Sequence, residues 1–386
     1  NHWYGRVTVR LVGFMHTWIE INGENLRHNV RVFAGIVGKE RLAPVLKSNA
    51  YGHGLRETWE ALKSENPGWI AVNYVSEGKD LRSFGFTGRI LVVGPFLTDE
   101  MAEAARHKLE LFVGHSEGIS AWLASKTKPE LHIEFDTGMS RQGFHPEDAG
   151  SLAEKLLADK KLIRGVCMHF ANVEDVTEHE YARVQLNRFD VAVKAFTGRR
   201  FDVITHSASS ASTLILDESR FDLARVGISI YGFWPSQATK ISYKQLHGDV
   251  IELKPVLSWR AKITSLNDVA QGRYVGYGCT FKARHAMRVA VVPVGYFEGY
   301  PRIASGTQAY VLIHGERCPV VGRICMNMMM VDVTDISAKT AVGAVVTLIG
   351  RDGQEYVSAS DVASWSETIH YELVTRLNPA IERRLI

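Results

Sequence analysis

Hydrophobic positions in the first 240 residues recur as short runs separated by longer amphipathic stretches. Each run is rich in β-branched residues and is followed by a turn of polar residues or glycine. We interpret eight of them as strands: Leu42–Leu46, Trp69–Tyr74, Ile90–Val93, Glu110–Val113, Leu131–Phe135, Ile163–Met168, Asp202–Thr205 and Leu223–Val226. Helical spacing of apolar residues lies between them, at 77–84, 99–107, 147–157 and 181–196. Strands that alternate with helices indicate a parallel sheet, and eight such units predict a closed (β/α)8 TIM-type barrel.

A helix is expected ahead of the first strand, over Asn22–Ile36, with Asn22 as its N-cap. After about residue 236 the strand-like runs follow one another without helices, separated by turn residues. These runs are Val256–Ile263, Met287–Val294, Ala309–Ile313, Pro319–Ile324, Met328–Val333 and Val345–Ile349. They predict a mostly β C-terminal domain that closes with a helix near Ala359–His370. We expect the barrel over residues 16–240 and the β domain over 241–386, and residues 1–15 could pack with the latter.

Composition restricts the class of protein. Hydrophobic residues make up 46% of the 386 residues and charged residues 23%, which is typical of a soluble globular enzyme. The net charge is +3 and no basic stripe with interleaved aromatics is present, so we expect no nucleic-acid partner. No apolar run reaches the ~18 residues that span a bilayer, so we expect no membrane partner. The four cysteines lie far apart without a CxxC pair, which favours reduced thiols in a cytoplasmic protein over a metal site or disulfides.

The candidate chemistry lies at the C-terminal ends of the predicted barrel strands, where barrel enzymes have their active sites. Polar residues there are Lys47 after the first strand, Arg141 after the fifth, His169 after the sixth, Ser209 and Ser210 after the seventh, and Arg225 with Gly227 and Ile228 at the eighth. This set contains an amine that could form an imine, two arginines, a histidine and a turn of small residues that could bind a phosphate.

Lys47 alone would be weak evidence, because a lysine after a buried strand usually just leaves the core for solvent. Its neighbours change the picture, since residues 48–54 form a short polar loop rather than a charged helix surface. At the mouth of an apolar barrel an amine is desolvated, which favours its neutral and nucleophilic form. Lys47 is therefore our candidate for an amine that condenses with an aldehyde.

The other candidates each have a structural alternative. His169 could be an ordinary structural histidine, and Ser209-Ser210 could be only a helix N-cap. The functional alternative is that free N–H groups there bind a phosphate dianion, with Gly227 permitting close approach. Arg225 could form a structural ion pair with a nearby carboxylate. If it instead faces a cofactor pyridine nitrogen, it would keep that nitrogen unprotonated, which suits reversible proton transfer.

Several segments resemble the alanine racemase family, the fold-type III racemases that depend on pyridoxal 5'-phosphate (PLP). The segment PVLKSNAYGHG around Lys47 is similar to the family's PLP-attachment segment. Further similarities follow in order: DTGMSRQG at 136–143, MHFA at 168–171, HSASS at 206–210, RVGISIYG at 225–232, VGYG at 275–278, GY at 295–296, GRICM at 322–326 and ETIHYE at 367–372. One such motif would be weak, but the series is specific. The family's fold, a barrel followed by a β domain, agrees with the predicted elements.

The resemblance implies the reaction, which is interconversion of L-alanine and D-alanine to supply D-alanine for cell-wall peptidoglycan. Lys47 would hold PLP as a Schiff base and act as one acid/base group, with Tyr277 as the other on the opposite face of the α-carbon. Racemisation removes a proton from one face and returns it to the other, so two groups are the natural arrangement. A free tyrosine titrates near ~10, so Tyr277 needs neighbours to act as a base. The resemblance supplies His169, bonded to both the tyrosine and Arg225.

The resemblance also implies which residues bind cofactor and substrate. The PLP phosphate would lie among Tyr51, Ser209, Ser210, Gly227, Ile228 and Tyr371. Arg141 would bond the cofactor's phenolic oxygen and the substrate carboxylate, which would also meet the backbone N–H of Met326, with Asn327 beside it. Tyr296 would narrow the entrance.

Tyr277 and Met326 lie in the predicted β domain. In the family these residues reach the barrel of the other subunit. The resemblance therefore implies a head-to-tail homodimer in which each active site is shared between two subunits.

Two positions depart from the commonest family pattern. Glu134 stands where many members have a lysine that carbon dioxide carbamylates, so we expect its carboxylate to supply permanently the negative charge that orients Arg141. The alternative is an ordinary exposed strand residue. Asn327 stands where an aspartate is frequent, which keeps the hydrogen-bonding capacity but loses the charge. We expect Asn327 to alter the pH dependence and not to abolish racemisation.

Four other functions are weighed against alanine racemisation. A racemase for serine, or one of broad specificity, differs least, and Tyr296 and Tyr371 at the entrance favour alanine. A PLP-dependent decarboxylase is disfavoured by Arg225. A non-racemising PLP-barrel protein is disfavoured by the β domain that carries Tyr277. A metal-dependent barrel hydrolase is disfavoured because the histidines and aspartates lack ligand spacing.

Overall fold

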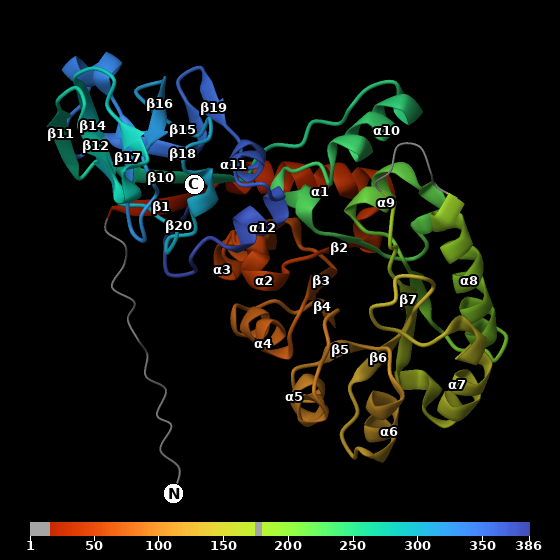
Figure 1. Ribbon diagram of the computed structural model, residues 1–386. Helices are drawn as coiled ribbons and strands as arrows, with labels where there is room; N and C mark the ends of the chain where they lie inside the picture. The colour runs from red at the N-terminus through yellow and green to blue at the C-terminus, as the bar shows by residue number, and fades with distance from the viewer. Residues whose placement is uncertain (1–15, 174–179) are drawn as a thin grey trace, which may run out of the picture. The chain divides into compact units, whose positions relative to one another are not determined.

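The computed structural model describes residues 16–173 and 180–386, and its contacts divide the chain into two units (Figure 1). The barrel unit comprises Asn22–Tyr51 and Leu55–Val256. The β unit comprises, among the described residues, 16–21, Gly52–Gly54 and Leu257–Ile386. Each unit is described by itself. The expected packing of residues 1–15 falls outside the described part of the chain.

Eight parallel strands form the barrel, as the hydrophobic runs predicted. They are β2 (Leu42–Pro44), β3 (Trp69–Val72), β4 (Arg89–Val92), β5 (Leu109–Val113), β6 (Glu130–Phe135), β7 (Ile163–Met168), β8 (Ile204–His206) and β9 (Ala224–Val226). Strands β3 to β8 pair in order, and β2 pairs with β9. A bridge between Val45 and Ala71 joins β2 to β3, and the Arg225 amide donates to the Ala208 carbonyl at 3.0 Å between β9 and the end of β8. These contacts close the ring, which confirms the barrel.

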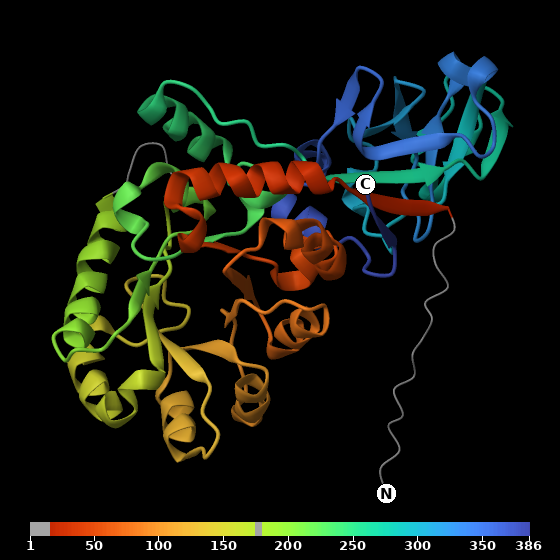
Figure 2. The same ribbon diagram turned by 180° about the vertical axis from the view of Figure 1, so that it is seen from behind.

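The helix α1 precedes β2, α2 is a short turn at the end of β2, and from α3 on one helix follows each strand outside the ring of strands (Figures 1 and 2). They are α1 (Gly23–Val37), α2 (Lys47–Tyr51), α3 (Leu55–Leu62), α4 (Val75–Ser83), α5 (Met101–Arg106), α6 (Ser116–Ala124), α7 (Ala149–Leu156), α8 (Glu180–Thr197), α9 (Ser210–Ile215) and α10 (Gln237–His247). Asn22 is the N-cap of α1, as predicted, and its side-chain oxygen accepts the Asn25 amide at 2.9 Å. The helix α10 was not predicted from the sequence.

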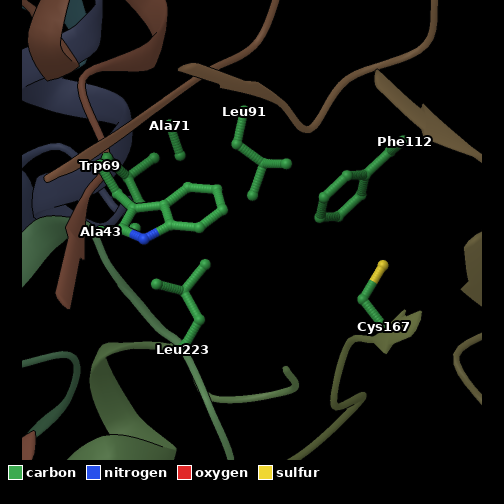
Figure 3. Packing of buried hydrophobic residues seen from close by; sticks show 8 residues of the cluster. Ala43, Trp69, Ala71, Leu91, Phe112, Cys167 and Leu223 are labelled. Carbon is green, nitrogen blue, oxygen red and sulfur yellow. The ribbon is translucent and has the colours of Figure 1, made fainter. Parts of the chain in front are cut away.

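Apolar side chains from the strands fill part of the barrel interior (Figure 3). Trp69, Leu91 and Phe112 point inward from β3, β4 and β5, and Cys167 faces them from β7. Small residues at Ala43 and Ala71 make room for the indole ring of Trp69. The interior is thus a packed core, which holds the strand ends in fixed positions.

The β unit is built on an extended sheet. Its strands are β1 (Thr17–Ile21), β10 (Leu257–Lys262), β11 (Ser265–Val269), β12 (Tyr274–Val275), β13 (Phe281–Lys282), β14 (Met287–Val292), β15 (Tyr310–Ile313), β16 (Glu316–Val321), β17 (Met329–Asp332), β18 (Val345–Asp352), β19 (Glu355–Val357) and β20 (Glu382–Leu385). The sheet order is β11-β14-β17-β16-β15-β18-β10-β1-β20. Two short helices, α11 (Ala359–Trp365) and α12 (His370–Thr375), precede β20. All six predicted runs correspond to strands, so the mostly β second part is confirmed.

The boundary between the units differs from the one expected at residue 240. Strand β1 pairs antiparallel with β10 and parallel with β20, so residues 17–21 belong to the β unit. Residues up to Val256 remain with the barrel unit because Asn29 of α1 donates to the Lys254 carbonyl at 2.8 Å and the Asn22 amide donates to the Val256 carbonyl at 2.8 Å. Within the described ranges, every helix is too short or too polar to cross a membrane.

Candidate active site

Lys47 begins an unusual turn at the C-terminal end of β2. Ser48, Asn49, Ala50 and Tyr51 have φ angles of 58°, 54°, 53° and 52°, which is one turn of left-handed helix built without glycine. For L-residues this conformation costs roughly 1–2 kcal/mol each. Other contacts must therefore hold the turn in place.

A single carboxylate, that of Glu77, supplies such contacts. Its Oε1 accepts the Ser48 amide at 2.6 Å and the Asn49 amide at 3.3 Å. Its Oε2 accepts the Asn73 amide at 2.7 Å and the Tyr74 amide at 3.3 Å, which caps the start of α4. From the sequence alone, Glu77 could be placed only in a helical stretch, and this role was missed. The detectable signal was its position three residues after the helix N-cap.

The environment of Lys47 favours a neutral amine. The side chain is half-buried, and burial lowers its pKa, as do the positive charges of Arg141 and then Arg225. The carboxylate of Glu77 opposes this shift but does not reverse it. The desolvated lysine expected from the sequence is therefore present, and two of the other candidate residues contribute to its pKa shift.

Arg225 lies buried in β9. Its guanidinium donates to the Met168 carbonyl at 2.8 Å and the Ser207 carbonyl at 3.3 Å, and Nη1 donates to Nδ1 of His206. Burial lowers its pKa. Among the described residues no carboxylate forms an ion pair with Arg225, so the structural alternative of a direct Asp or Glu partner is wrong.

Small residues after β8 and β9 lie close to Tyr51. The Gly227 amide donates to the Ser210 hydroxyl at 3.0 Å. A Cβ added at Gly227 would lie 2.4 Å from the Tyr51 hydroxyl, so this close approach requires glycine. Burial raises the pKa of Tyr51, which keeps its phenol a neutral hydrogen-bond donor. The structure therefore brings together Tyr51, Ser210 and Gly227, with Ile228 next in the chain.

Ser209 has the structural role that was left open for it. It is the N-cap of α9, and its amide donates to the Ser212 hydroxyl at 2.8 Å. The first amides of a helix have no partner within the helix. Ser209 thus positions the amides of α9, whereas the Ser210 side chain is the one directed to Gly227.

The segment that carries Arg141 is a tight loop. The Asp136 carboxylate accepts the amides of Gly138, Met139 and Ser140 at 2.9, 2.9 and 3.0 Å. Partial burial would raise the pKa of Asp136, but these three N–H groups lower it below its ordinary value. The loop thereby holds the Arg141 backbone, while the residue is exposed.

Helix α8 supports this loop and the one after β7. Buried Gln185 donates to the Thr137 hydroxyl at 3.1 Å and accepts the Ala171 amide at 3.0 Å. It thus links the Arg141 loop to the segment of His169. Burial lowers the pKa of His169 to about 3, with smaller contributions from Arg225, Arg141 and Lys47. His169 is therefore neutral at physiological pH. Gln185 lies in a helical pattern and was not identified from the sequence.

Glu134 is buried at the end of β6, which excludes the alternative of an exposed strand residue. Its carboxylate accepts a hydrogen bond from Gln142, and no hydrogen bond joins it to Arg141 in the described part of the chain. Burial raises its pKa to about 7, although Gln142, Arg225 and Arg141 act in the opposite direction. Its charge near neutral pH is therefore partial, not the permanent charge expected from the sequence.

In the β unit, Tyr277 is presented on a glycine turn. It is 70% exposed and lies between Gly276 and Gly278, whose φ angles are 76° and 72°. Added Cβ atoms at these glycines would lie 3.2 Å from the backbone and 3.0 Å from the side chain of Arg323, respectively. The turn therefore projects the phenol outward from the segment that contains Arg323.

The same segment continues to Met326 and lies against the Tyr296 loop. The Tyr296 amide donates to the Cys325 carbonyl at 3.1 Å. Buried Glu298 accepts the Gly295 amide at 2.8 Å and the side-chain amide of Asn327 at 2.9 Å. Asparagine at 327 thus pairs with a carboxylate that an aspartate would repel. Tyr296 and Met326 remain 44% and 54% exposed, and Tyr371 lies in α12.

The residues of the barrel unit fit the requirements of PLP. Glycine is required where Gly227 meets the Tyr51 hydroxyl, and the hydroxyls and amides there are the neutral donors that a phosphate accepts. Lys47 offers an amine with a lowered pKa. Arg225 offers a fixed guanidinium that forms no ion pair with a carboxylate within the described residues. No group of three or more metal-binding side chains occurs in the part of the chain that the structure describes.

Comparison with known proteins gives the family. Residues 21–235 match the family profile described as "Alanine racemase, N-terminal domain", and residues 256–385 match "Alanine racemase, C-terminal domain". The chain belongs to the alanine racemase family. It is therefore a PLP-dependent amino-acid racemase, and the predicted isomerase class and cofactor are confirmed.

Individual alanine racemases match over almost their whole length. The chain is 36% identical to alanine racemase of Leptospira interrogans over 376 residues, covering 96% of each chain. It is 32% identical to that of Methanococcus maripaludis, covering 95% of this chain and 97% of the relative. Its structure is similar to that of alanine racemase from Streptomyces lavendulae, with a TM-score of 0.85, 29% identity, and 96% and 97% of the two chains covered. The enzyme from E. faecalis matches with a TM-score of 0.86, 28% identity and 97% and 100% coverage.

Proposed function

We propose that this racemase interconverts L- and D-alanine, with Lys47 as the attachment point of PLP and with Lys47 and Tyr277 as the two acid/base groups. The observation that carries the proposal is the Lys47 amine, whose pKa is lowered at the C-terminal end of β2 beside Arg141 and Arg225. When bound, PLP withdraws electrons from the substrate and lowers the barrier to loss of the α-proton. The residues of the chain must then move that proton between two faces.

Lys47 and Tyr277 divide this work. Because the pKa of the Lys47 amine is lowered, Nζ more readily reaches the neutral form that can take up a proton and return it. The hydroxyl of Tyr277 gives or takes the proton on the opposite face. His169 stays neutral, so one of its ring nitrogens can accept a hydrogen bond from the Tyr277 phenol. Arg225 would face the pyridine nitrogen and, as a cation, keep it unprotonated.

The remaining residues bind and orient. Tyr51, Ser210, Gly227 and Ile228 would hold the phosphate together with Tyr371, while Ser209 sets the start of α9. Arg141 and the backbone amide of Met326 would both donate hydrogen bonds to the substrate carboxylate. Tyr296 would limit the size of the substrate side chain, which favours alanine over serine. The carboxylate of Glu134, when ionised, would partly offset the positive charges of Arg141 and Arg225.

The family resemblance and the places of the two acid/base groups in the chain support an active site that is shared between subunits. Lys47 belongs to the barrel unit and Tyr277 to the β unit, where its ring is 70% exposed on a glycine turn. We propose a head-to-tail homodimer in which Tyr277, Met326 and Tyr296 of one subunit complete the site of the other. We also propose a cytoplasmic enzyme that supplies D-alanine for peptidoglycan.

The activity is tested with L-alanine in deuterium oxide. Loss of optical rotation together with deuterium at the α-carbon is expected for the purified protein with PLP. Release of carbon dioxide, or rotation that stays constant, would exclude racemisation of alanine. Parallel reactions with serine and lysine rank the substrates, and equal rates for serine would replace alanine by a broader specificity.

The shared site is tested by mixing two inactive variants, Lys47→Ala and Tyr277→Phe. In a head-to-tail dimer, a mixed pair contains one site with both lesions and one intact site. After exchange of subunits, about a quarter of wild-type activity should return, because half of the dimers are mixed and half of their sites are intact. No recovery, with subunit exchange verified by native mass spectrometry, would show that each site is built from one chain.

A further inference from the structure

A continuous chain of five polar side chains, four of them buried, crosses the interior of the barrel. It joins Arg89, the first residue of β4, to Glu110 of β5, His132 of β6, His206 of β8 and Arg225 of β9. His132 and His206 are fully buried, and Glu110 and Arg225 are 4% and 7% exposed. Barrel interiors are normally filled by apolar side chains, so a polar chain at this depth calls for a physical reason.

Each link of the chain is a hydrogen bond. Arg89 donates to both oxygens of Glu110 at 2.6 and 2.7 Å. Nε2 of His132 lies 2.7 Å from Oε2 of Glu110, and Nδ1 of His132 lies 2.8 Å from Nε2 of His206. Nη1 of Arg225 donates to Nδ1 of His206. The five residues thereby connect the N-terminal end of the barrel to its C-terminal end.

The direction of every bond follows from the two ends. An arginine only donates, so Nδ1 of His206 must accept and carries no proton. The single proton of the neutral ring is then on Nε2 and is donated to Nδ1 of His132. His132 in turn carries its proton on Nε2 and donates it to Glu110, which accepts as an anion. Both imidazoles are thus neutral and in the Nε2–H tautomer.

The barrel is built around these rings. A Cβ at Gly165 of β7 would lie 2.0 Å from Nδ1 of His132, so the glycine leaves the space that the imidazole occupies. The register between β6 and β7 shifts next to His132. Trp69 and Phe112, which point inward in Figure 3, flank the same ring with centroids 6.2 and 6.0 Å away. The position of the ring is therefore fixed by packing as well as by hydrogen bonds.

We propose that Glu110, at the far end of this chain, is a positioning residue for Arg225. As an anionic acceptor it fixes the tautomer of His132 and through it that of His206, so that Nδ1 of His206 always faces Arg225 as an acceptor. Together with the carbonyls of Met168 and Ser207, this acceptor sets the plane of the Arg225 guanidinium. The consequence for catalysis rests on the proposed function, in which Arg225 faces the PLP pyridine nitrogen.

Other tautomers become accessible when Glu110 is changed. With Glu110→Leu the His132 proton has no acceptor, both rings can reverse, and a proton on Nδ1 of His206 would then oppose the N–H of Arg225. Glu110→Gln keeps one oxygen that can accept from His132, although its amide can also flip and donate. We therefore expect the glutamine variant to lie between wild type and the leucine variant.

The first experiment uses apoprotein labelled with 15N-histidine and no substrate. In wild type, the imidazole N–H signals assigned to His132 and His206 are expected to be protected from exchange and to come from neutral rings protonated at Nε2. Protonation of the His132 or the His206 ring at Nδ1, or at both nitrogens, would overturn the proposal without any variant being needed. In Glu110→Leu at least one of these signals should be lost or change tautomer.

The second experiment measures PLP affinity of the apoprotein and the steady-state constants of the holoenzyme. Outer residues that orient a cofactor-binding group typically change affinity or activity by about 10–100-fold. We expect Glu110→Leu to raise the Kd for PLP and to lower kcat by roughly tenfold or more, with KM for alanine nearly unchanged, and Glu110→Gln to fall between. Equal values for wild type and Glu110→Leu would refute the positioning role.

Glu130→Gln is the matched control. Glu130 pairs with Glu110 in the register of β5 and β6 but forms its ion pair with Arg164 outside the chain of five residues. The Glu130→Gln substitution should leave the histidine signals, the PLP affinity and kcat at wild-type values. If the wild-type protein shows the expected tautomers but does not racemise alanine, the proposed function fails and the inference about Glu110 stands. If the protein racemises alanine but its His132 and His206 tautomers are reversed, the inference about Glu110 fails and the proposed function stands.

Discussion

Replacing Glu77 by glutamine should open the turn that carries Lys47. The four left-handed residues after Lys47 cost roughly 4–8 kcal/mol in total at about 1–2 kcal/mol each. Hydrogen bonds to a charged acceptor are worth about 1.5–3 kcal/mol each, so the two bonds from Ser48 and Asn49 offset a large part of this strain.

Glutamine cannot serve both pairs of amides. One oxygen of Glu77 accepts from the turn and the other from Asn73 and Tyr74, so an amide group must direct its N–H toward one of the two pairs. The turn can open without unfolding the barrel, and we expect this opening to become easier by roughly 2–4 kcal/mol. Amide exchange of Ser48 and Asn49 should then accelerate by about 30-fold to 700-fold, because each 1.4 kcal/mol is a factor of ten.

Hydrogen–deuterium exchange of the peptide that covers residues 47–54, with mass-spectrometric detection, measures this directly. PLP affinity should fall in parallel, since Tyr51 lies at the end of the same turn. Glu100→Gln is the control, because its carboxylate also accepts a helix-start amide, that of Leu97 at 2.7 Å, but far along the chain from Lys47. Exchange in 47–54 that is the same in Glu77→Gln, Glu100→Gln and wild type would refute the idea that Glu77 holds the turn.

Three further substitutions test other parts of the structure. Gly227→Ala should weaken PLP binding by tenfold or more in a fluorescence titration, because the new Cβ would lie 2.4 Å from the Tyr51 hydroxyl. The control Gly35→Ala lies in open space on α1 and should raise thermal stability by about 0.5–1 kcal/mol. Equal PLP affinity in the two variants would contradict the steric argument. Asn327→Asp should destabilise the protein in urea by roughly 1–3 kcal/mol, because a second carboxylate meets the buried oxygen of Glu298; adding Glu298→Gln should restore stability, and a cost that persists in the double variant would argue against the pairing. Glu134→Gln should change how apoprotein stability depends on pH. The folded-state pKa of Glu134 is raised to about 7, so wild type binds this proton more tightly when folded and loses up to ~3 kcal/mol as pH rises from about 5 to about 7; the variant should lack that loss, and parallel pH curves would exclude a raised pKa.

The strands of the barrel could be predicted because each is mostly buried on both faces and forms a short run that is rich in apolar residues. Strands β12 and β13 could not, since each has only two residues, and β11 carries the polar sequence SLNDV. The place of β1 was missed for another reason. Its partners β10 and β20 lie more than 230 residues away, and no local pattern reports such a pairing.

The candidate site was predictable at the strand ends and from the family motifs, but the residues that support it were not. Glu110 and His132 were visible as polar residues inside predicted core strands, which is the one signal that could have drawn attention to them. Gln185 and Glu298 gave no such signal, because their roles depend on which loops the fold brings to them. Glu134 was identified by position, whereas its partial charge depends on a degree of burial that only the structure supplies.

The course of the chain between the two units bears on how the protein could be dissected. Ile21 pairs directly with Leu257 in the antiparallel register of β1 and β10, and the barrel unit begins at Asn22 and ends at Val256. In genetic terms the barrel is inserted between two facing residues of a hairpin. Deleting residues 22–256 and joining Ile21 to Leu257 through a two-residue Asn-Gly turn would give the β sheet a continuous chain. Such a miniature would lack only the three residues Gly52–Gly54 and would present Tyr277 without the barrel.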